Sequence, residues 1–341
     1  MMITRPILAA YCGHYGIDTI TVSDVQRLDI LFYAFGIVQN GTVTLEHPED
    51  FAMFQKYRQL NPQLKILLSL SGGGENGFST AARTPAERER LVVDTLRIVK
   101  KYDFDGVDVD WEFPTVNGVA EERDWHTQLL CLFHQELDKL SDERKYLLSI
   151  AAPCGEWCFQ VLDLERSVKY LDLVNLMTYD MAAELHMTCH HTAAYAQAKR
   201  QLAQASIVEN VQIFAAHGIP REKMIVGAAF YSRLWHGVEA IGQGLFVPTK
   251  DGSEYGPGYT ELIYHYENRN GYTRYWDDTA KAPYLFNGDT FITYDDKESL
   301  AIKCRQVHEL AVAGIMVWEY AYDKEHVLIR HMRESLDNKI Q

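Results

Sequence analysis

The sequence predicts an α/β fold, a (β/α)8 barrel, from three observations. Short apolar runs rich in β-branched residues alternate with segments of helical periodicity, as parallel strands joined by crossover helices do. Eight such runs can be distinguished. The 341 residues also leave room for insertions, since such barrels typically need about 250 residues. The predicted strands are Ile7–Gly13, Ile30–Ile37, Lys65–Ser69, Gly106–Trp111, Leu147–Ala151, Leu173–Met177, Met224–Ala228 and Gly314–Trp318.

Two of the intervening segments show the helical period most clearly. Apolar residues recur at helical spacing over residues 91–99, after Pro85, and over residues 125–137, after Glu121 and Glu122. Proline and acidic residues are typical of a helix start. The sequence therefore places crossover helices after the third and fourth strands.

The alternation breaks once, between the seventh and eighth strands. Residues 235–291 are rich in Tyr, Gly and Asp, and two short β-like runs, Pro283–Phe286 and Thr290–Tyr294, flank an Asn-Gly-Asp turn of the kind that joins hairpins. This segment is too long for a bare loop and too short for an independent domain. We expect one barrel domain over residues 1–341, with 235–291 as a small α+β insertion subdomain that forms one wall of a cleft.

Composition narrows the possible partners. The chain is 47% apolar and 23% charged, an ordinary globular balance. Its formal net charge of −14 argues against nucleic acid or an anionic membrane as a partner, and no run approaches the length of a membrane span. We expect a monomer whose substrate is neutral or cationic.

The N-terminal apolar run and the cysteines give further expectations. The run Ile7–Ala10 is too short for the apolar core of a signal peptide and is interpreted as the first strand, so a cytoplasmic location is favoured unless the chain was trimmed. The six cysteines lack zinc-like spacing, and free buried thiols are expected. Because neither H-E-x-x-H nor a strand-linked G-x-G-x-x-G occurs, no metal or cofactor is expected.

The fourth strand carries a row of acids. Side chains alternate along a strand, so Asp108, Asp110 and Glu112 share one face while the residues between them are Val and Trp. An acidic strand on a solvated sheet edge would carry Lys or Thr on its other face. The pattern instead predicts an apolar face under helices and an acidic face that points into the barrel.

Acids in such a row cannot all ionise cheaply in a poorly solvated interior, so at least one should hold a proton. Glu112 is nearest the open end of the strand, where a substrate could reach it. It is therefore the candidate general acid.

The same stretch resembles a known family. Asp105, Asp108, Asp110 and Glu112 match the D-x-x-D-x-D-x-E signature of glycoside hydrolase family 18, the chitinases and their relatives. By the alternation of the strand, Asp105 falls on the opposite face from the other three acids, and we expect it to have a structural role.

Other strand ends are similar to the family's motifs. Lys65–Gly73 resembles K-x-x-x-S-x-G-G, with Ser71 in place of the first Gly; the resemblance implies that Ser69 bonds Asp108. A turn without chemical role is the alternative interpretation of the glycines. The stretch 177–180 matches M-x-Y-D, which implies that Met177, Tyr179 and Asp180 belong to the site.

The remaining motifs concern substrate contacts. Residues 227–233 resemble G-x-P-F-Y-G-R, with Tyr231 and Arg233 retained where the family contacts sugar. Trp318 ends the eighth strand, and the resemblance makes it the floor beneath the sugar. Tyr11 and Phe35 end the first two strands and are weaker candidates for the same pocket.

The family resemblance implies a substrate-assisted, retaining hydrolysis. The N-acetyl oxygen of the substrate attacks the anomeric carbon while Glu112 protonates the leaving oxygen. Asp110 accepts the acetamido N–H, Tyr179 donates to the acetamido carbonyl, and Asp108 shares a proton with Asp110. The expected substrate is chitin or a chitooligosaccharide. Two alternatives stay open: hydrolysis of peptidoglycan or a glycoprotein glycan by the same chemistry, and an inactive chitin-binding lectin. Lectins of this kind typically lose the acid that Glu112 supplies.

Overall fold

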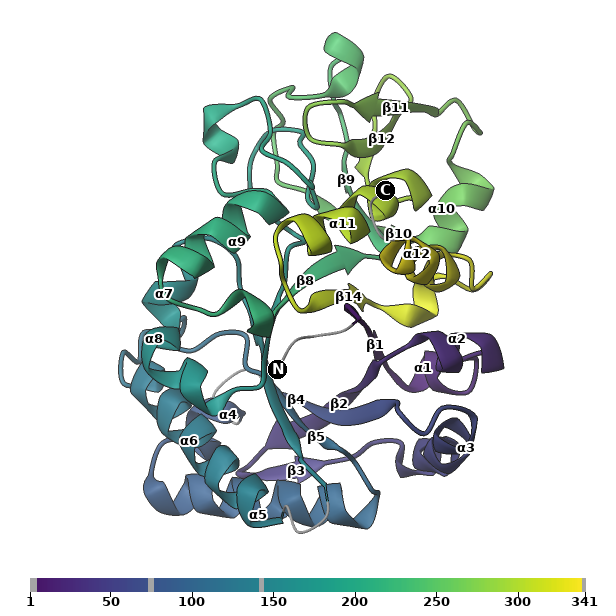
Figure 1. Cartoon of the computed structure of the whole chain (residues 1–341). Coiled ribbons are helices and arrows are strands. Elements are labelled where there is room, and N and C mark those ends of the chain that lie inside the picture. The colour runs from purple at the N-terminus through teal and green to yellow at the C-terminus, as the bar shows by residue number, and fades with distance from the viewer. Residues whose placement is uncertain (1–4, 73–76, 141–143, 339–341) are drawn as a thin grey trace.

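A closed barrel of eight parallel strands forms the centre of the molecule (Figure 1). The computed structural model describes residues 5–72, 77–140 and 144–338. Each barrel strand is hydrogen-bonded to the next, and β1 closes the ring by pairing with both β14 and β2. The predicted barrel is therefore confirmed. Its strands are β1 (Ile7–Cys12), β2 (Ile30–Gln39), β4 (Lys65–Ser71), β5 (Gly106–Asp110), β6 (Leu147–Ala152), β7 (Leu173–Leu176), β8 (Met224–Ala229) and β14 (Gly314–Trp318).

The strand ends differ from the prediction by one or two residues. β2 runs to Gln39, where it pairs with the antiparallel strand β3 (Thr42–Thr44). β4 continues to Ser71, because Ser71 still pairs with Asp110 of β5. The strand β5 itself ends at Asp110 rather than Trp111. Gly73 and Gly74 of the glycine-rich stretch lie outside the described residues.

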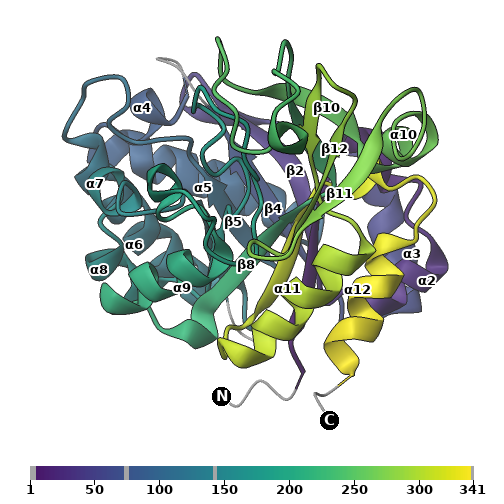
Figure 2. The same cartoon turned by 90° about the horizontal axis from the view of Figure 1, so that it is seen from above.

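Helices surround the strands (Figure 2). The two predicted ones are α5 (Pro85–Lys101) and α6 (Glu122–Leu140). Thr84 closes the start of α5 with a capping box, since its hydroxyl accepts the N–H of Glu87 while the Glu87 carboxylate accepts the N–H of Thr84. The other helices around the barrel are α1 (His14–Ile17), α2 (Val22–Arg27), α3 (Ala52–Leu60), α4 (Phe78–Ala81), α7 (Cys158–Val161), α8 (Leu164–Ser167), α9 (Ile207–Ala216), α11 (Lys297–Glu309) and α12 (Leu328–Asp337).

The two faces of β5 divide as the alternation predicts. Val107 and Val109 are fully buried in the apolar layer between the strands and the helices, where each buried valine contributes about 1.5–3 kcal/mol. Asp108 points into the barrel, whose interior is otherwise filled mainly by side chains such as Phe32 and Leu67. The barrel is thus an apolar core with an acidic patch at one strand.

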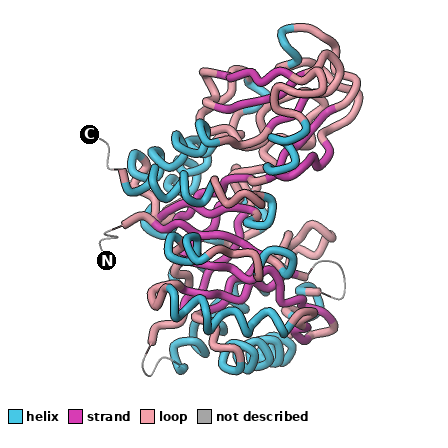
Figure 3. The backbone as a smooth tube through the Cα atoms, turned by 90° about the vertical axis from the view of Figure 1, so that its right-hand side faces the viewer, coloured by secondary structure: helices cyan, strands magenta, loops and turns pink. Residues whose placement is uncertain are grey.

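A second, antiparallel sheet lies between β8 and β14 in the chain and beyond one side of the barrel (Figure 3). Its strand order is β10-β9-β13-β12-β11, and the helix α10 (Tyr259–His265) accompanies it. The side-chain oxygen of Asn287 accepts the N–H groups of Asp289 and Thr290 and so shapes the predicted hairpin turn between β12 and β13. The sheet is wider than residues 235–291. Its strands are β9 (Tyr231–Trp235), β10 (Glu254–Gly258), β11 (Thr273–Asp277), β12 (Ala282–Phe286) and β13 (Phe291–Thr293).

Two global features complete the fold. All six cysteines are free, and four of them are buried, which agrees with the expectation of free thiols. Among the described residues, no helix combines the length and apolarity needed to cross a membrane.

Candidate active site

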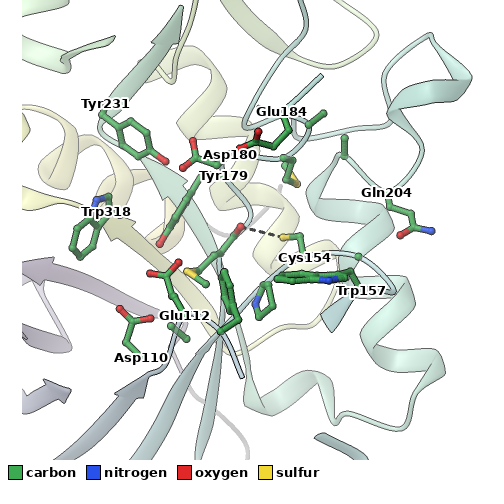
Figure 4. Close-up of a pocket in the computed structure, with 18 of the residues that line it drawn as sticks. Asp110, Glu112, Cys154, Trp157, Tyr179, Asp180, Glu184, Gln204, Tyr231 and Trp318 are labelled. Atoms are coloured by element: carbon green, nitrogen blue, oxygen red, sulfur yellow. Dashed lines mark hydrogen bonds between the residues drawn. The ribbon is translucent and has the colours of Figure 1, made fainter. Parts of the chain in front are cut away.

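A cavity of about 710 Å³ opens where the barrel strands end (Figure 4). Most of the predicted site residues line it. Asp108, Ser69 and Arg233 are the predicted residues that do not. The predicted residues in the cavity wall are Tyr11, Phe35, Asp110, Glu112, Met177, Tyr179, Asp180, Tyr231 and Trp318.

Asp108 lies beneath the cavity, fully buried. Its carboxylate accepts hydrogen bonds from Ser69 at 2.7 Å, Ser149 at 2.6 Å, Tyr11 at 3.0 Å and Asn175 at 3.2 Å. Burial raises the pKa of Asp108, while these four hydrogen bonds act in the opposite direction. The Ser69 contact is the one that the resemblance implied. Ser149 and Asn175 escaped the sequence analysis, although a polar residue on the inward face of an apolar strand could have signalled them.

Asp110 lines the cavity and is only 5% exposed. Burial, and then the charges of Glu112 and Asp108, raise the pKa of Asp110 well above its ordinary value. Its Oδ1 is buried and has no hydrogen-bond partner among the described residues. No hydrogen bond joins Asp108 to Asp110 in the described part of the chain, so their proton sharing stays a prediction.

Glu112 follows the end of β5, and its side chain is exposed to the cavity. Figure 4 shows its carboxyl group between Trp318 on one side and Trp157 on the other. The desolvating walls of the cavity, and then the negative charge of Asp180, raise the pKa of Glu112. A reachable carboxyl group that keeps its proton is what a general acid requires.

Asp180 is held by residues from three segments. Its Oδ1 lies 3.1 Å from Nε of Arg233 and 3.3 Å from Nδ1 of the buried His191, and its Oδ2 accepts the hydroxyl of Tyr255 at 3.2 Å. Burial alone would raise the pKa of Asp180, but His191 and Arg233 lower it on balance. Asp180 is therefore an anion whose Oδ1 lies beside the Arg233 cation and whose Oδ2 accepts a hydrogen bond from Tyr255.

Arg233 thus occupies a different place from the one predicted. Its guanidinium group lies 4.0 Å from the centre of the Tyr255 ring and pairs with Asp180. The structure places it behind the cavity wall, where it can act on a substrate through Asp180 and Tyr255.

Aromatic side chains form the other wall. The Trp318 ring stacks against Phe35 at 5.6 Å and lies 5.7 Å from Tyr11. Tyr179 packs edge-on to Tyr231 at 6.1 Å. Burial, and then the charges of Asp110 and Glu112, raise the pKa of Tyr179, so its phenol remains a hydrogen-bond donor.

The sequence analysis missed the far half of the cavity. Figure 4 shows Cys154, Trp157, Glu184 and Gln204 on the side away from Trp318. Their loops follow β6 and β7, and no motif marks them, although the 40% exposure of Trp157 is unusual for a tryptophan. The described residues that line the cavity include neither Lys, Arg nor His.

Comparisons with known proteins agree on one family. The model of the glycosyl hydrolases family 18 matches residues 7–323. Chitinase A1 of Niallia circulans is 32% identical in an alignment of 341 positions, and this alignment covers 88% of this chain and 49% of that protein. The chain thus spans about half the length of this relative.

Solved structures give the same picture. A family 18 N-acetylglucosaminidase from Paenibacillus barengoltzii superposes with a TM-score of 0.92 at 36% identity, covering 97% of this chain and 99% of that one. The chitinase ChiW from Paenibacillus sp. str. FPU-7 has a TM-score of 0.89 at 36% identity, covering 98% of this chain and 43% of that one.

Proposed function

Because the chain belongs to family 18 of the glycosyl hydrolases, we propose that it is a chitinase. It hydrolyses β-1,4-linked N-acetylglucosamine polymers or oligosaccharides with retention of configuration. The observation that carries this proposal is the pairing of a reachable Glu112 of raised pKa with a buried Asp110 oxygen that lacks a partner. The first can protonate a leaving oxygen, and the second can accept an N–H group.

The nucleophile is the acetamido group of the substrate. An ordinary retaining glycosidase needs a second carboxylate as nucleophile. Asp180 is the candidate for this role, because its negative charge acts on Glu112 and raises the pKa of Glu112. The Arg233 cation beside Oδ1 and the Tyr255 hydroxyl bonded to Oδ2 stabilise the Asp180 carboxylate, which makes Asp180 a poor nucleophile.

The reaction then runs in two steps. The acetamido oxygen bonds to the anomeric carbon as the glycosidic C–O bond breaks, and the Glu112 proton passes to the leaving oxygen. Asp110 accepts the acetamido N–H and balances the positive charge of the oxazolinium, while Tyr179 donates to the acetamido oxygen. Glu112, now ionised, removes a proton from the water that opens the ring, which restores its acid form.

Other residues hold the sugar or the catalytic groups. Trp318 supplies the apolar floor, and Tyr231 and Met177 line the same pocket. Asp108, fixed by Ser69, raises the pKa of Asp110 through its negative charge.

We also propose that residues 235–291 act as an insertion subdomain within a catalytic domain that spans residues 1–341. Tyr255 belongs to this segment and supports the role, because it lines the cavity and its hydroxyl donates a hydrogen bond to Asp180 of the barrel. The protein works as a monomer in this proposal, since every catalytic group comes from one chain.

Product analysis tests the proposal. Incubation with chitohexaose should release N-acetylglucosamine or short oligomers, and chromatography identifies them. Turnover of peptidoglycan or of a glycoprotein glycan in place of chitohexaose would favour the second candidate, which the similarity to an N-acetylglucosaminidase supports. Binding of chitohexaose without turnover would mean a lectin.

A further inference from the structure

Two histidines and a glutamate from two segments of the chain meet outside the cavity. His14 follows β1, whereas His47 and Glu49 lie between β3 and α3. Each residue offers one possible ligand atom, and these three atoms all lie within 4.8 Å of one another. We propose that His14, His47 and Glu49 bind a divalent transition-metal ion, with Zn²⁺ as the main occupant.

The contact between His14 and Asp50 matches the carboxylate–imidazole pairs of known metal sites. Nδ1 of His14 lies 3.1 Å from both oxygens of Asp50, and Nδ1 of His47 lies 3.1 Å from Glu49. Asp50 is itself only 7% exposed and accepts the hydroxyl of Tyr33 at 2.8 Å. A carboxylate behind an imidazole fixes the ring and makes its other nitrogen a better ligand.

The two imidazoles need one small movement to share an ion. Their rings stack with centroids 3.5 Å apart and an angle of 11° between the planes, so their lone pairs run parallel rather than converging. The side chains are 35% and 38% exposed, and the terminal torsion of His is soft. Because Asp50 holds the His14 ring, the movement that this proposal requires is rotation of the His47 ring, which releases Glu49 to bind the ion.

The donor set selects the kind of metal. Two imidazole nitrogens and one carboxylate oxygen suit Zn²⁺ with a water in the fourth position, whereas Ca²⁺ and Mg²⁺ prefer oxygen ligands alone. No motif marks this site in the sequence, because His14 lies far along the chain from His47 and Glu49. None of the three lines the cavity, so the ion joins two loops and takes no part in the hydrolysis.

Zinc titration of the metal-free full chain by isothermal calorimetry tests the site. We expect one saturable equivalent, and a higher melting temperature with zinc, because a ligand that binds only the folded state stabilises it. The double variant His14→Gln with His47→Gln should lose this equivalent. Asp50→Asn, which keeps the ligands, should weaken binding by about 10–100-fold.

His217→Gln is the matched control. His217 is 28% exposed and contacts Glu156 and Glu165, but no second imidazole from the described residues joins it in a metal-binding group, so its loss should leave the titration unchanged. Circular dichroism verifies that each variant is folded, and the single variant His47→Gln replaces the double variant if that one does not fold. No saturable equivalent, unchanged binding in the folded variant, or sulfur ligands in the X-ray absorption spectrum of the zinc form would overturn the proposal.

Discussion

At the scale of single residues, the acid function of Glu112 can be separated from the fold. Glu112→Gln keeps the shape of the side chain but removes the acidic proton, so the turnover rate should fall by about 10²–10⁴-fold. Affinity for chitooligosaccharides and the melting temperature should change little, because the side chain faces the cavity. Steady-state kinetics and calorimetry measure both. A rate within tenfold of wild type would place the acid elsewhere.

The charge of Asp180 should set the alkaline limit of activity. Glu112 must be protonated to act, so activity is lost as the pH rises through its pKa, which Asp180 helps to raise. Asp180→Asn removes that negative charge and leaves the Arg233 cation unpaired. Both changes lower the pKa of Glu112, and the alkaline limb of the kcat/KM profile should move to lower pH.

Glu184→Gln serves as the control for this pH profile. Glu184 also lines the cavity, but it is not among the groups that shift Glu112. An equal displacement in both variants would show a general field effect rather than a specific action of Asp180.

Asp110 should lower the free energy of unfolding at neutral pH while it supports turnover. Its pKa is raised in the folded state, so the folded state binds the proton more tightly than the unfolded state does. The free energy of unfolding therefore falls as the pH rises from the unfolded pKa through the folded one. Asp110→Asn should remove this loss and raise the melting temperature at neutral pH, while turnover falls. Calorimetric scans between acidic and neutral pH, with the exposed Glu89→Gln as control, check the sign; a lower melting temperature at neutral pH would contradict it.

At the scale of elements, a buried ion pair ties α11 to the catalytic strand ends. Lys303 is fully buried, and its Nζ lies 2.6 Å from Asp295 and donates to Thr192 at 2.6 Å. The hydroxyl of Thr192 lies 3.2 Å from the carbonyl oxygen of Thr178, which precedes Tyr179. Lys303 therefore positions the segment that carries Tyr179.

Replacing Lys303 should be costly in a specific way. Lys303→Met leaves the Asp295 charge buried and uncompensated. Removing one partner of a buried ion pair typically lowers the free energy of unfolding by about 3–5 kcal/mol, and we expect a loss of that size. The double variant Lys303→Met with Asp295→Asn should recover most of the stability but not the full kcat, since Thr192 still lacks its donor. Urea unfolding measures the first effect, and the exposed Lys100→Met is the control. A loss no larger than that of Lys100→Met would contradict the prediction.

Element boundaries show what local sequence could predict. The start of α5 at Pro85 and the turn at Asn287 depend on residues within a few positions of one another, so both could be predicted from the sequence. The loop that carries Glu184 was not. Its conformation depends on distant contacts, such as the hydroxyl of Thr188, which donates to the carbonyl oxygen of Gly244 at 2.6 Å.

At the scale of the whole molecule, barrel closure explains why half of the cavity was predictable. Inward-facing residues at strand ends must meet at one mouth, so Tyr11, Asp110 and Trp318 could be grouped from the predicted barrel together with the family resemblance. Arg233 comes shortly after the barrel strand β8, yet it lies within β9, which belongs to the second sheet. Its side chain therefore approaches the site from behind the wall, which alternation in the barrel could not reveal.

The complete cavity predicts which bond the enzyme can cleave. If the acetamido group of the substrate attacks, an oligosaccharide with glucosamine at the cleaved position has no nucleophile, because Asp180 is engaged by Arg233, His191 and Tyr255. Such a bond should resist hydrolysis, whereas glucosamine on the leaving side should be tolerated by a cavity without Lys, Arg or His among its described lining residues. A thiazoline analogue of the oxazolinium should inhibit competitively, and nuclear magnetic resonance should show the β anomer as the first product. Cleavage beside a deacetylated sugar at a comparable rate, or mass-spectrometric trapping of a glycosyl ester on Asp180, would refute the roles given to Glu112 and Asp110.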